Sequence, residues 1–291
     1  ITAVAVDSTN ASGTDSVVYT LVRAPTVTID APADGASVPT TTPTISGSTS
    51  EPGATIEVIL DPGPNQQVVT TTADANGLWA VTSPALTEGD HTVQVRATGT
   101  SNTPSAPVSN DFEVDVTDPS LTLTSPDPTN GTATSNPREP ITGISEPGAT
   151  VEIFVDGTKI GETVAEPSGA WSFTPVADLS EGERVIRAAA TDAAGNTATP
   201  QEGRLTVDTL APRVTIVQPA EGTSTSTVVT ISGTSSEPNT TIEVVVDENT
   251  PNEQTLNAVT DAQGDWSVMA TVTEGNHSAT VNLLDAAGNS S

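Results

Sequence analysis

The chain has 291 residues, which is too long for one small domain, and its 37 acidic residues outnumber its 8 basic ones to give a net charge of −29. This balance argues against nucleic acid or an anionic membrane as a partner, because phosphate groups are bound by lysine and arginine. Cysteine is absent, which excludes disulfides, and no apolar run reaches the roughly 18 residues that membrane insertion needs. Divalent cations are the natural complement of the charge, although acidity can also serve solvation alone.

Three copies of one pattern follow one another with a period of about 90 residues. The tract at residues 50–58 returns at residues 145–153 and 236–244. Each copy continues with a Gly-x-Trp motif and a Glu-Gly pair in the same phase; these contain Trp79, Trp171 and Trp266, then Glu88, Glu181 and Glu274. The period predicts an array of modules, with a remnant at 1–22 and modules at 23–117, 118–209 and 210–291.

Residues 1–22 are predicted to be the last two strands of a preceding module. Residues 1–7 align with residues 186–192, and residues 16–22 stand where the last strand of a module belongs. The chain is therefore expected to begin inside a module.

The first complete module has the composition of an all-β sandwich. Thr, Val, Ile and Ser dominate, Gly and Pro recur about every eight to twelve residues, and no stretch has a helical period. Ile56, Val58 and Leu60 alternate with other residues, which predicts one buried face. We expect about seven strands, near residues 26–31, 43–50, 55–61, 66–73, 78–84, 91–98 and 110–117.

Two recurring turns support this prediction. Glu51-Pro52-Gly53 predicts a tight turn, because Pro presets φ and Gly accepts a positive φ. Asn239 takes the place of that Gly in the third copy, and Asn is the next best residue for positive φ. The Gly-x-Trp motif predicts a hairpin turn followed by a strand whose Trp anchors the core.

The third module, 210–291, lacks the seventh strand that the pattern requires. A sandwich without an edge strand exposes unpaired backbone groups and part of its core. Two explanations remain: the chain is a window cut from a longer array, or a strand from a neighbouring molecule fills the gap.

The best candidate site is a set of oxygen ligands at the junction of the second and third modules. Asp192 and Asn196 lie in the Asp-Ala-Ala-Gly-Asn loop between strands six and seven, and Asp208 lies in the linker after strand seven. Because loops gather at the two ends of a sandwich, we expect this loop and this linker to lie at the same end. Carboxylate and amide oxygens suit Ca²⁺, although the same motif is also an ordinary turn.

The other junctions carry incomplete versions of this set. Asp115 and Asp118 occupy the first linker, but the preceding loop at 99–102 has no Asp. Asp285 and Asn289 repeat the loop of the second module, and we expect them to form half a site whose linker is missing. Calcium at these positions is a weaker expectation.

Enzymatic chemistry has little support in the sequence. His91 and His277 occupy the same module position, where the second module has Arg184. With no Cys and no Ser-His-Asp arrangement around them, we interpret both histidines as solvent-facing residues at a strand start. The chain is predicted not to be an enzyme.

The succession of motifs resembles bacterial Ig-like repeats of giant repetitive adhesins and biofilm-associated surface proteins. It runs through the Ser-Glu-Pro-Gly-Ala-Thr turn, Gly-x-Trp, Glu-Gly, Asp-Ala-Ala-Gly-Asn and Asp-Thr-x-Ala-Pro, and covers the whole chain. The resemblance implies a tandem array of Ig-like Greek-key β-sandwiches forming an extended rod, which serves as a stalk or spacer on the bacterial cell surface. It also implies Ca²⁺ at module boundaries, held here by Asp192, Asn196 and Asp208.

Two other functions remain open at this point. The chain could be a self-assembling extracellular filament subunit, in which copies complete one another by strand addition. It could also be a carbohydrate-binding or other ligand-binding module, although few aromatic residues remain for an exposed binding face. The expected partners are neighbouring Ig-like modules of the same chain or array and other copies in a fibre, with no nucleic acid and no direct membrane insertion.

Overall fold

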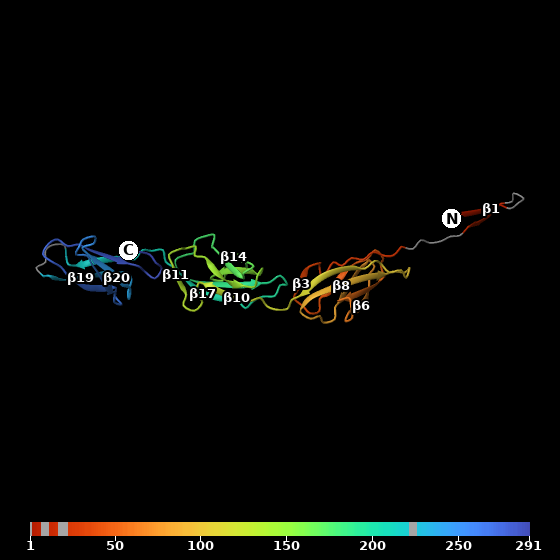
Figure 1. The fold of residues 1–291 in the computed structure, drawn as a ribbon, viewed down its shortest axis with the longest axis horizontal. Helices are drawn as coiled ribbons and strands as arrows, with labels where there is room; N and C mark the ends of the chain where they lie inside the picture. Colours follow the sequence, from red (N-terminus) through yellow and green to blue (C-terminus); the bar gives the residue numbers. More distant parts are fainter. Residues whose placement is uncertain (1, 7–11, 17–22, 221–225) are drawn as a thin grey trace. The chain divides into compact units, whose positions relative to one another are not determined.

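The computed structural model describes residues 2–6, 12–16, 23–220 and 226–291, and among them every regular element is a β-strand (Figure 1). No helix within these ranges is long and apolar enough to cross a membrane. The chain forms two compact units: one holds the residues up to Thr117 together with Ala193–Asn196, and the other holds the rest.

A short hairpin stands near the N-terminus. Strand β1 (Thr2–Val6) pairs antiparallel with β2 (Ser12–Ser16), with Val6 opposite Ser12. The sequence predicted the second strand of this segment at residues 16–22, of which 17–22 lie outside the described residues. That part of the expectation remains a prediction.

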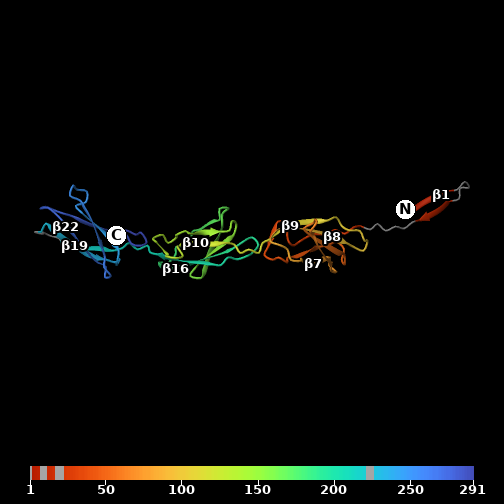
Figure 2. The same ribbon diagram turned by 60° about the horizontal axis from the view of Figure 1, so that its bottom comes forward.

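The first module is a sandwich of two sheets. A five-stranded sheet in the order β3-β9-β8-β5-β6 lies against the pair β4-β7, and Figure 2 shows β8 and β9 side by side. The strands are β3 (Ala36–Val38), β4 (Thr44–Ser48), β5 (Thr55–Leu60), β6 (Gln67–Thr72), β7 (Leu78–Thr82), β8 (Gly89–Thr98) and β9 (Val108–Val114).

The structure corrects the strand predictions at the start of this module. Residues 26–31 form no continuous strand. They run beside β4 through two isolated bridges, Val27 to Thr49 and Ala31 to Ser46, and through nearby backbone hydrogen bonds, and Pro32 then offers no N–H to continue a ladder. Strand β3 was not predicted, and it pairs in parallel with β9. Three residues are too few to show a period in the sequence.

The second module repeats this architecture. Its sheets have the orders β11-β17-β16-β13-β14 and β10-β12-β15. The strands are β10 (Leu121–Ser125), β11 (Thr132–Thr134), β12 (Ile141–Ser145), β13 (Thr150–Val155), β14 (Thr158–Val164), β15 (Ala170–Phe173), β16 (Gly182–Thr191) and β17 (Gln201–Val207).

The third module contains two three-stranded sheets, β18-β19-β22 and β21-β20-β23. Its strands are β18 (Val214–Gln218), β19 (Val228–Ser235), β20 (Thr241–Val246), β21 (Gln254–Val259), β22 (Asp265–Thr271) and β23 (Ala279–Leu283). Strand β23 occupies the position of β8 and β16, whose partners are β9 and β17. No strand follows β23 in the described part of the chain.

Each module has its own apolar core, built by the alternation that the sequence predicted. The inward-facing residues of β5, β13 and β20 are all buried; they are Ile56, Val58 and Leu60, then Val151, Ile153 and Val155, then Ile242, Val244 and Val246. The sequence therefore predicts this strand correctly in all three copies.

A tryptophan packed on a glycine closes each core. Gly143 of β12 lies directly opposite Trp171 of β15, and a Cβ atom on Gly143 would stand 2.4 Å from the indole and 2.0 Å from the Thr122 carbonyl oxygen. The same cross-strand pair recurs as Gly47 with Trp79 and Gly233 with Trp266. All three indoles are 3% exposed, and their buried Nε1 atoms have no hydrogen-bond partner. The rings therefore act as apolar filling, which confirms their predicted structural role.

Gly143→Ala should destabilise the second module by about 1–3 kcal/mol, because the added methyl group overpacks the space taken by Trp171 and the Thr122 carbonyl. Urea unfolding of the whole chain, followed by tryptophan emission, measures the effect. Thr142→Ala is the matched control, since residue 142 is the partly exposed neighbour on the same strand. Equal midpoints for the two variants would contradict the close Gly–Trp packing.

Candidate functional site

The linker between the second and third modules is held by the second module, which precedes it in the chain. The Asp208 N–H donates to the Thr134 carbonyl oxygen over 2.9 Å. The backbone N–H of Thr209 donates to the Glu181 carboxylate over 3.2 Å, and the Thr209 hydroxyl donates to the same group over 2.5 Å. Glu181 belongs to the Glu-Gly pair. This recurring motif therefore has a defined role, which is to fix the exit of the chain from its module.

The third module, which follows the linker in the chain, holds the same linker through its Asp-Ala-Ala-Gly-Asn loop. The side-chain Nδ2 of Asn289 donates to the Asp208 carbonyl oxygen over 2.7 Å and to Asp285 Oδ2 over 2.8 Å. The Ser135 N–H donates to the Ala287 carbonyl oxygen over 3.1 Å. The peptide Asp208-Thr209 is thus bonded from both sides.

The first linker is built in the same way. The Asp115 N–H donates to the Val38 carbonyl oxygen over 3.1 Å, and the Thr117 hydroxyl donates to Glu88 Oε1 over 2.5 Å. Asn196, which belongs to the same compact unit as residue 115, donates its Nδ2 to the Asp115 carbonyl oxygen over 2.9 Å. One arrangement therefore occurs at two linkers.

These contacts correct the grouping of candidate ligands. Strands β16 and β17 form an antiparallel pair in which Gly182 lies opposite Val207, so Asp208 stands at the end of the sandwich where β16 begins. Asp192 follows β16 and stands at the other end. The prediction that Asp208 joins Asp192 and Asn196 is wrong, because the loop and the free ends of a hairpin lie at opposite ends.

The observed groups pair each linker with the loop of the following module. Asn196 lies with Asp115, while Asp285 and Asn289 lie with Asp208, so the latter loop does not lack a linker. All of these side chains are partly buried, as is Asp192, whereas Asp118 is exposed. Asp192 occupies the position in its loop that Asp285 occupies in the third module.

Hydrogen bonds within the loop stabilise the ionised form of Asp285. Partial burial alone would raise the pKa of this carboxyl group. The Asn289 amide and the backbone N–H groups of Asn289 and Ala287 outweigh burial and hold the pKa below its ordinary value. The carboxylate therefore stays charged at neutral pH and acts as the organising acceptor of the loop.

The donor chemistry of this junction fits a hard cation. The Asp285 carboxylate and the Asp208 carbonyl group present two oxygens that converge on one point, which is the chemistry that Ca²⁺ prefers. In the structure that point holds the Nδ2 of Asn289, and a half-turn of the amide would bring Oδ1 there instead. Across the described ranges, no three Asp, Glu, His or Cys residues form a group that could hold a metal. Amide, carbonyl and water oxygens would have to complete the site.

A second repeated cluster joins the residue after β5, β13 or β20 to the chain near the start of β8, β16 or β23. The aspartates Asp61, Asp156 and Asp247 all have positive φ, at 50°, 48° and 57°. Each binds the residue at the histidine position: His91 over 2.8 Å, Arg184 over 3.0 Å and His277 over 2.6 Å. Each Asp with its bonded His or Arg forms a clamp. The sequence did not reveal the clamps, since the two members are about 30 residues apart, but the shared module position of His and Arg was a usable signal.

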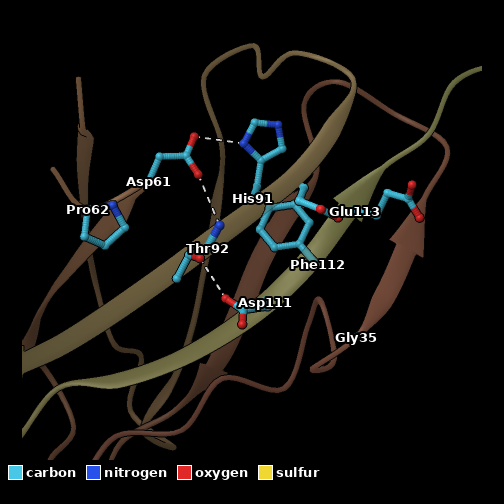
Figure 3. A pocket seen from close by; sticks show the side chains of 9 residues that line it. Gly35, Asp61, Pro62, His91, Thr92, Asp111, Phe112 and Glu113 are labelled. Carbon is cyan, nitrogen blue, oxygen red and sulfur yellow. Dashed lines mark hydrogen bonds and ion pairs between the residues drawn. The ribbon is translucent and has the colours of Figure 1, made fainter. Parts of the chain in front are cut away.

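Both members of the first clamp line a hollow together with Asp111 and Glu113 (Figure 3). Asp90 also lines this hollow. His91 is only 7% exposed and packs beside Phe112, with ring centroids 5.8 Å apart. The interpretation of His91 as solvent-facing is therefore wrong. The strand places its ring inward, where Asp61 and a backbone carbonyl receive it.

Both ring nitrogens of each histidine have acceptors. His91 bonds Asp61 through Nδ1 and the Thr87 carbonyl oxygen through Nε2, and His277 bonds Asp247 and the Thr273 carbonyl oxygen in the same way. Burial lowers the pKa of His91, but the Thr87 carbonyl and Asp61 outweigh it and raise the pKa above its ordinary value. Asp247 raises the pKa of His277. Neither imidazole has a free nitrogen to act as a general base.

The clamps predict a pH dependence that differs between modules. Because the folded-state pKa of each histidine is raised, the stabilisation is complete below the ordinary histidine pKa and is lost as pH rises through the folded value. Calorimetry between about pH 5 and pH 9 should show the first and third modules melting at lower temperature as pH rises. The second module, held by Arg184, should change little, and the double variant His91→Gln with His277→Gln should remove the dependence. A pH dependence that survives in this variant would contradict the assignment.

Comparison with known proteins identifies the family to which the three modules are similar. The sequence profile of the bacterial Ig-like domain matches residues 21–116, 116–209 and 219–291. No curated protein matches the chain in sequence.

Several solved structures are similar in fold. A tetra-tandem repeat in the extending region of a large adhesion protein has 21% identity and a TM-score of 0.32, over 99% of this chain and 78% of that one. Fibronectin(III)-like modules of Clostridium thermocellum CbhA have 22% identity and a TM-score of 0.41, over 62% and 94%. The BSP domain of a biofilm associated protein has 19% identity and a TM-score of 0.24, over 64% and 30%.

The three profile matches cover nearly the whole chain, and each contains one of the three buried cores. The chain belongs to the bacterial Ig-like domain family and contains three of these domains in tandem.

Proposed function

We propose that this chain is a segment of an extracellular stalk, which holds a more distal part of a bacterial surface protein away from the cell. The observation that carries the proposal is the repeated linker arrangement. The Glu-Gly glutamate of one module and the loop asparagine of the next both bond the same short peptide. A flexible tether would not need such contacts, whereas a spacer that must keep its modules in a fixed arrangement does.

The tandem architecture supports a mechanical role. Each module has its own core, so modules add length without adding long-range contacts, as in other repeat proteins. Their large negative charge keeps neighbouring copies apart in solution. A place on the bacterial cell surface agrees with the membership in the bacterial Ig-like family.

The chemistry of the described residues does not favour catalysis or carbohydrate binding. Both imidazoles are engaged at both nitrogens. The three Trp residues and Phe112 are buried, and Phe154 and Phe173 are partly buried. A carbohydrate site usually presents an exposed aromatic face, and none of these side chains provides one.

Calcium at the junctions is part of the proposal. At the second-to-third junction the ligands would be the Asp285 carboxylate, the Asn289 side-chain oxygen and the Asp208 carbonyl oxygen, with Asn196 and the Asp115 carbonyl oxygen as the counterparts at the first linker. A bound Ca²⁺ would supply positive charge that draws these oxygens together. The protein residues position the oxygens: the backbone N–H groups of the loop orient Asp285, and Glu181 fixes the linker.

Small-angle scattering of the chain in millimolar Ca²⁺ and then in chelator tests this proposal. A stalk segment should remain monomeric and give an extended particle in both conditions, and a gain of stiffness in Ca²⁺ measures what the ion adds to the joints. A compact particle in both conditions would overturn the stalk. Growth into large particles would favour the filament, in which copies complete one another by strand addition at the edge of β23.

A further inference from the structure

We infer that the Asn289 side-chain amide is an ion-independent latch, which holds the joint between the second and third modules closed when no calcium is bound. This inference rests on the proposed stalk function and deepens it, because it names the group that sets the joint. Asn196 has the corresponding role at the first linker.

The amide makes two bonds from one nitrogen. Nδ2 of Asn289 donates to the Asp208 carbonyl oxygen over 2.7 Å and to Asp285 Oδ2 over 2.8 Å. An NH₂ group has two hydrogens, so both bonds can form together. One of them crosses from the third module to the linker, and the other returns to the loop of the third module. The latch therefore ties the linker to an acceptor that is itself fixed.

Hydrogen bonds within the loop fix the position of the Asn289 side-chain amide. Asp285 Oδ1 accepts the N–H groups of Ala287 and Asn289 over 2.9 and 2.8 Å, and the Asp285 N–H donates to the Asn289 carbonyl oxygen over 3.1 Å. Gly288 allows the turn with a φ of 89°. The position of the amide is thus set before it meets the linker.

The linker on the other side is equally constrained. Asp208 Oδ1 accepts the Leu210 N–H over 3.0 Å, and Thr209 binds Glu181. The bond from the Ser135 N–H to the Ala287 carbonyl oxygen gives the loop a second attachment to the module behind. A joint held at these points has little freedom to bend until the hydrogen bond from the Asn289 side chain to Asp208 breaks.

The residue type at this position favours an amide latch over a site that serves an ion alone. A calcium site accepts Asp at least as well as Asn, because a carboxylate offers charge and two oxygens. A carboxylate at position 289 would instead face the Asp285 carboxylate and the Asp208 carbonyl oxygen, which repel it when no ion is present. Both loops that contact a linker in the structure carry Asn here, at 196 and 289.

The absence of cysteine allows a direct test by paired spin labels. Thr158→Cys in the second module and Thr255→Cys in the third place one label on each, at exposed strand positions. The distance distribution between the labels is measured in chelator. With Asn289 present we expect a narrow distribution. Asn289→Ala should raise the population of open joints about three- to tenfold, as expected for the loss of a hydrogen bond.

Matched controls separate the latch from general effects. Gln263→Ala and Gln263→Glu alter an exposed turn residue of the same module and should leave the distribution narrow. Asn289→Asp should open the joint in chelator as Asn289→Ala does, with folding of each variant checked by its melting temperature. An unchanged distribution for Asn289→Ala or Asn289→Asp would overturn the latch.

The unsubstituted chain distinguishes failure of the latch from failure of the stalk. A distribution that is broad in chelator and narrow only in Ca²⁺ would overturn the latch while leaving the calcium-stiffened stalk in place. A distribution that is broad in both conditions would overturn the latch and the fixed joints of the proposed function together.

Discussion

The structure of this chain depends on how a short linker peptide is held between two independently folded sandwiches. At Asp208-Thr209 the module behind contributes the Glu181 carboxylate and the Thr134 carbonyl oxygen, and the module ahead contributes the Asn289 amide. Each bond alone is worth only about 1 kcal/mol. Several of them acting on adjacent backbone groups restrict the linker far more than an unstructured tether, and the proposed spacer requires this restriction.

The acidic residues have a role that the net charge alone does not reveal. Many accept backbone N–H groups in turns: Asp74 Oδ1 accepts the N–H groups of Asn76 and Leu78, and Asp261 Oδ1 accepts those of Gln263 and Asp265. Asp285 does the same in the junction loop. The bonds from the N–H groups of Leu78 and Asn76 lower the pKa of Asp74. Part of the acidity therefore serves turn geometry, independently of any cation.

The sequence predicted the fold class, the repeat and the turns because these depend on local patterns. Alternation placed Ile56 and Val58 in the core, and Gly53 and Asn239 both have the positive φ that their exchange implied, at 74° and 56°. Strand β3 was missed because three residues carry no period, and its parallel pairing with β9 is a long-range contact.

The site was only partly predictable for a similar reason. The candidate residues were found by their motif, but their grouping required knowing which end of a hairpin each one occupies. Asp208 was assigned to the loop of its own module, whereas the antiparallel pairing of β16 with β17 places it beside the loop of the next one. The clamp of His91 by Asp61 was also hidden, because neither residue belongs to a recognisable motif and only the fold brings them together.

The most direct test of a fixed joint is whether the second and third modules reorient as one body. Residual dipolar couplings of backbone amides, measured in chelator in a weakly aligning medium, report the orientation and order of each module separately. The two sets of couplings should fit a single alignment tensor with equal magnitude. Tensors of clearly different magnitude would show that the modules move independently, and would contradict the claim that the linker peptide is held from both sides.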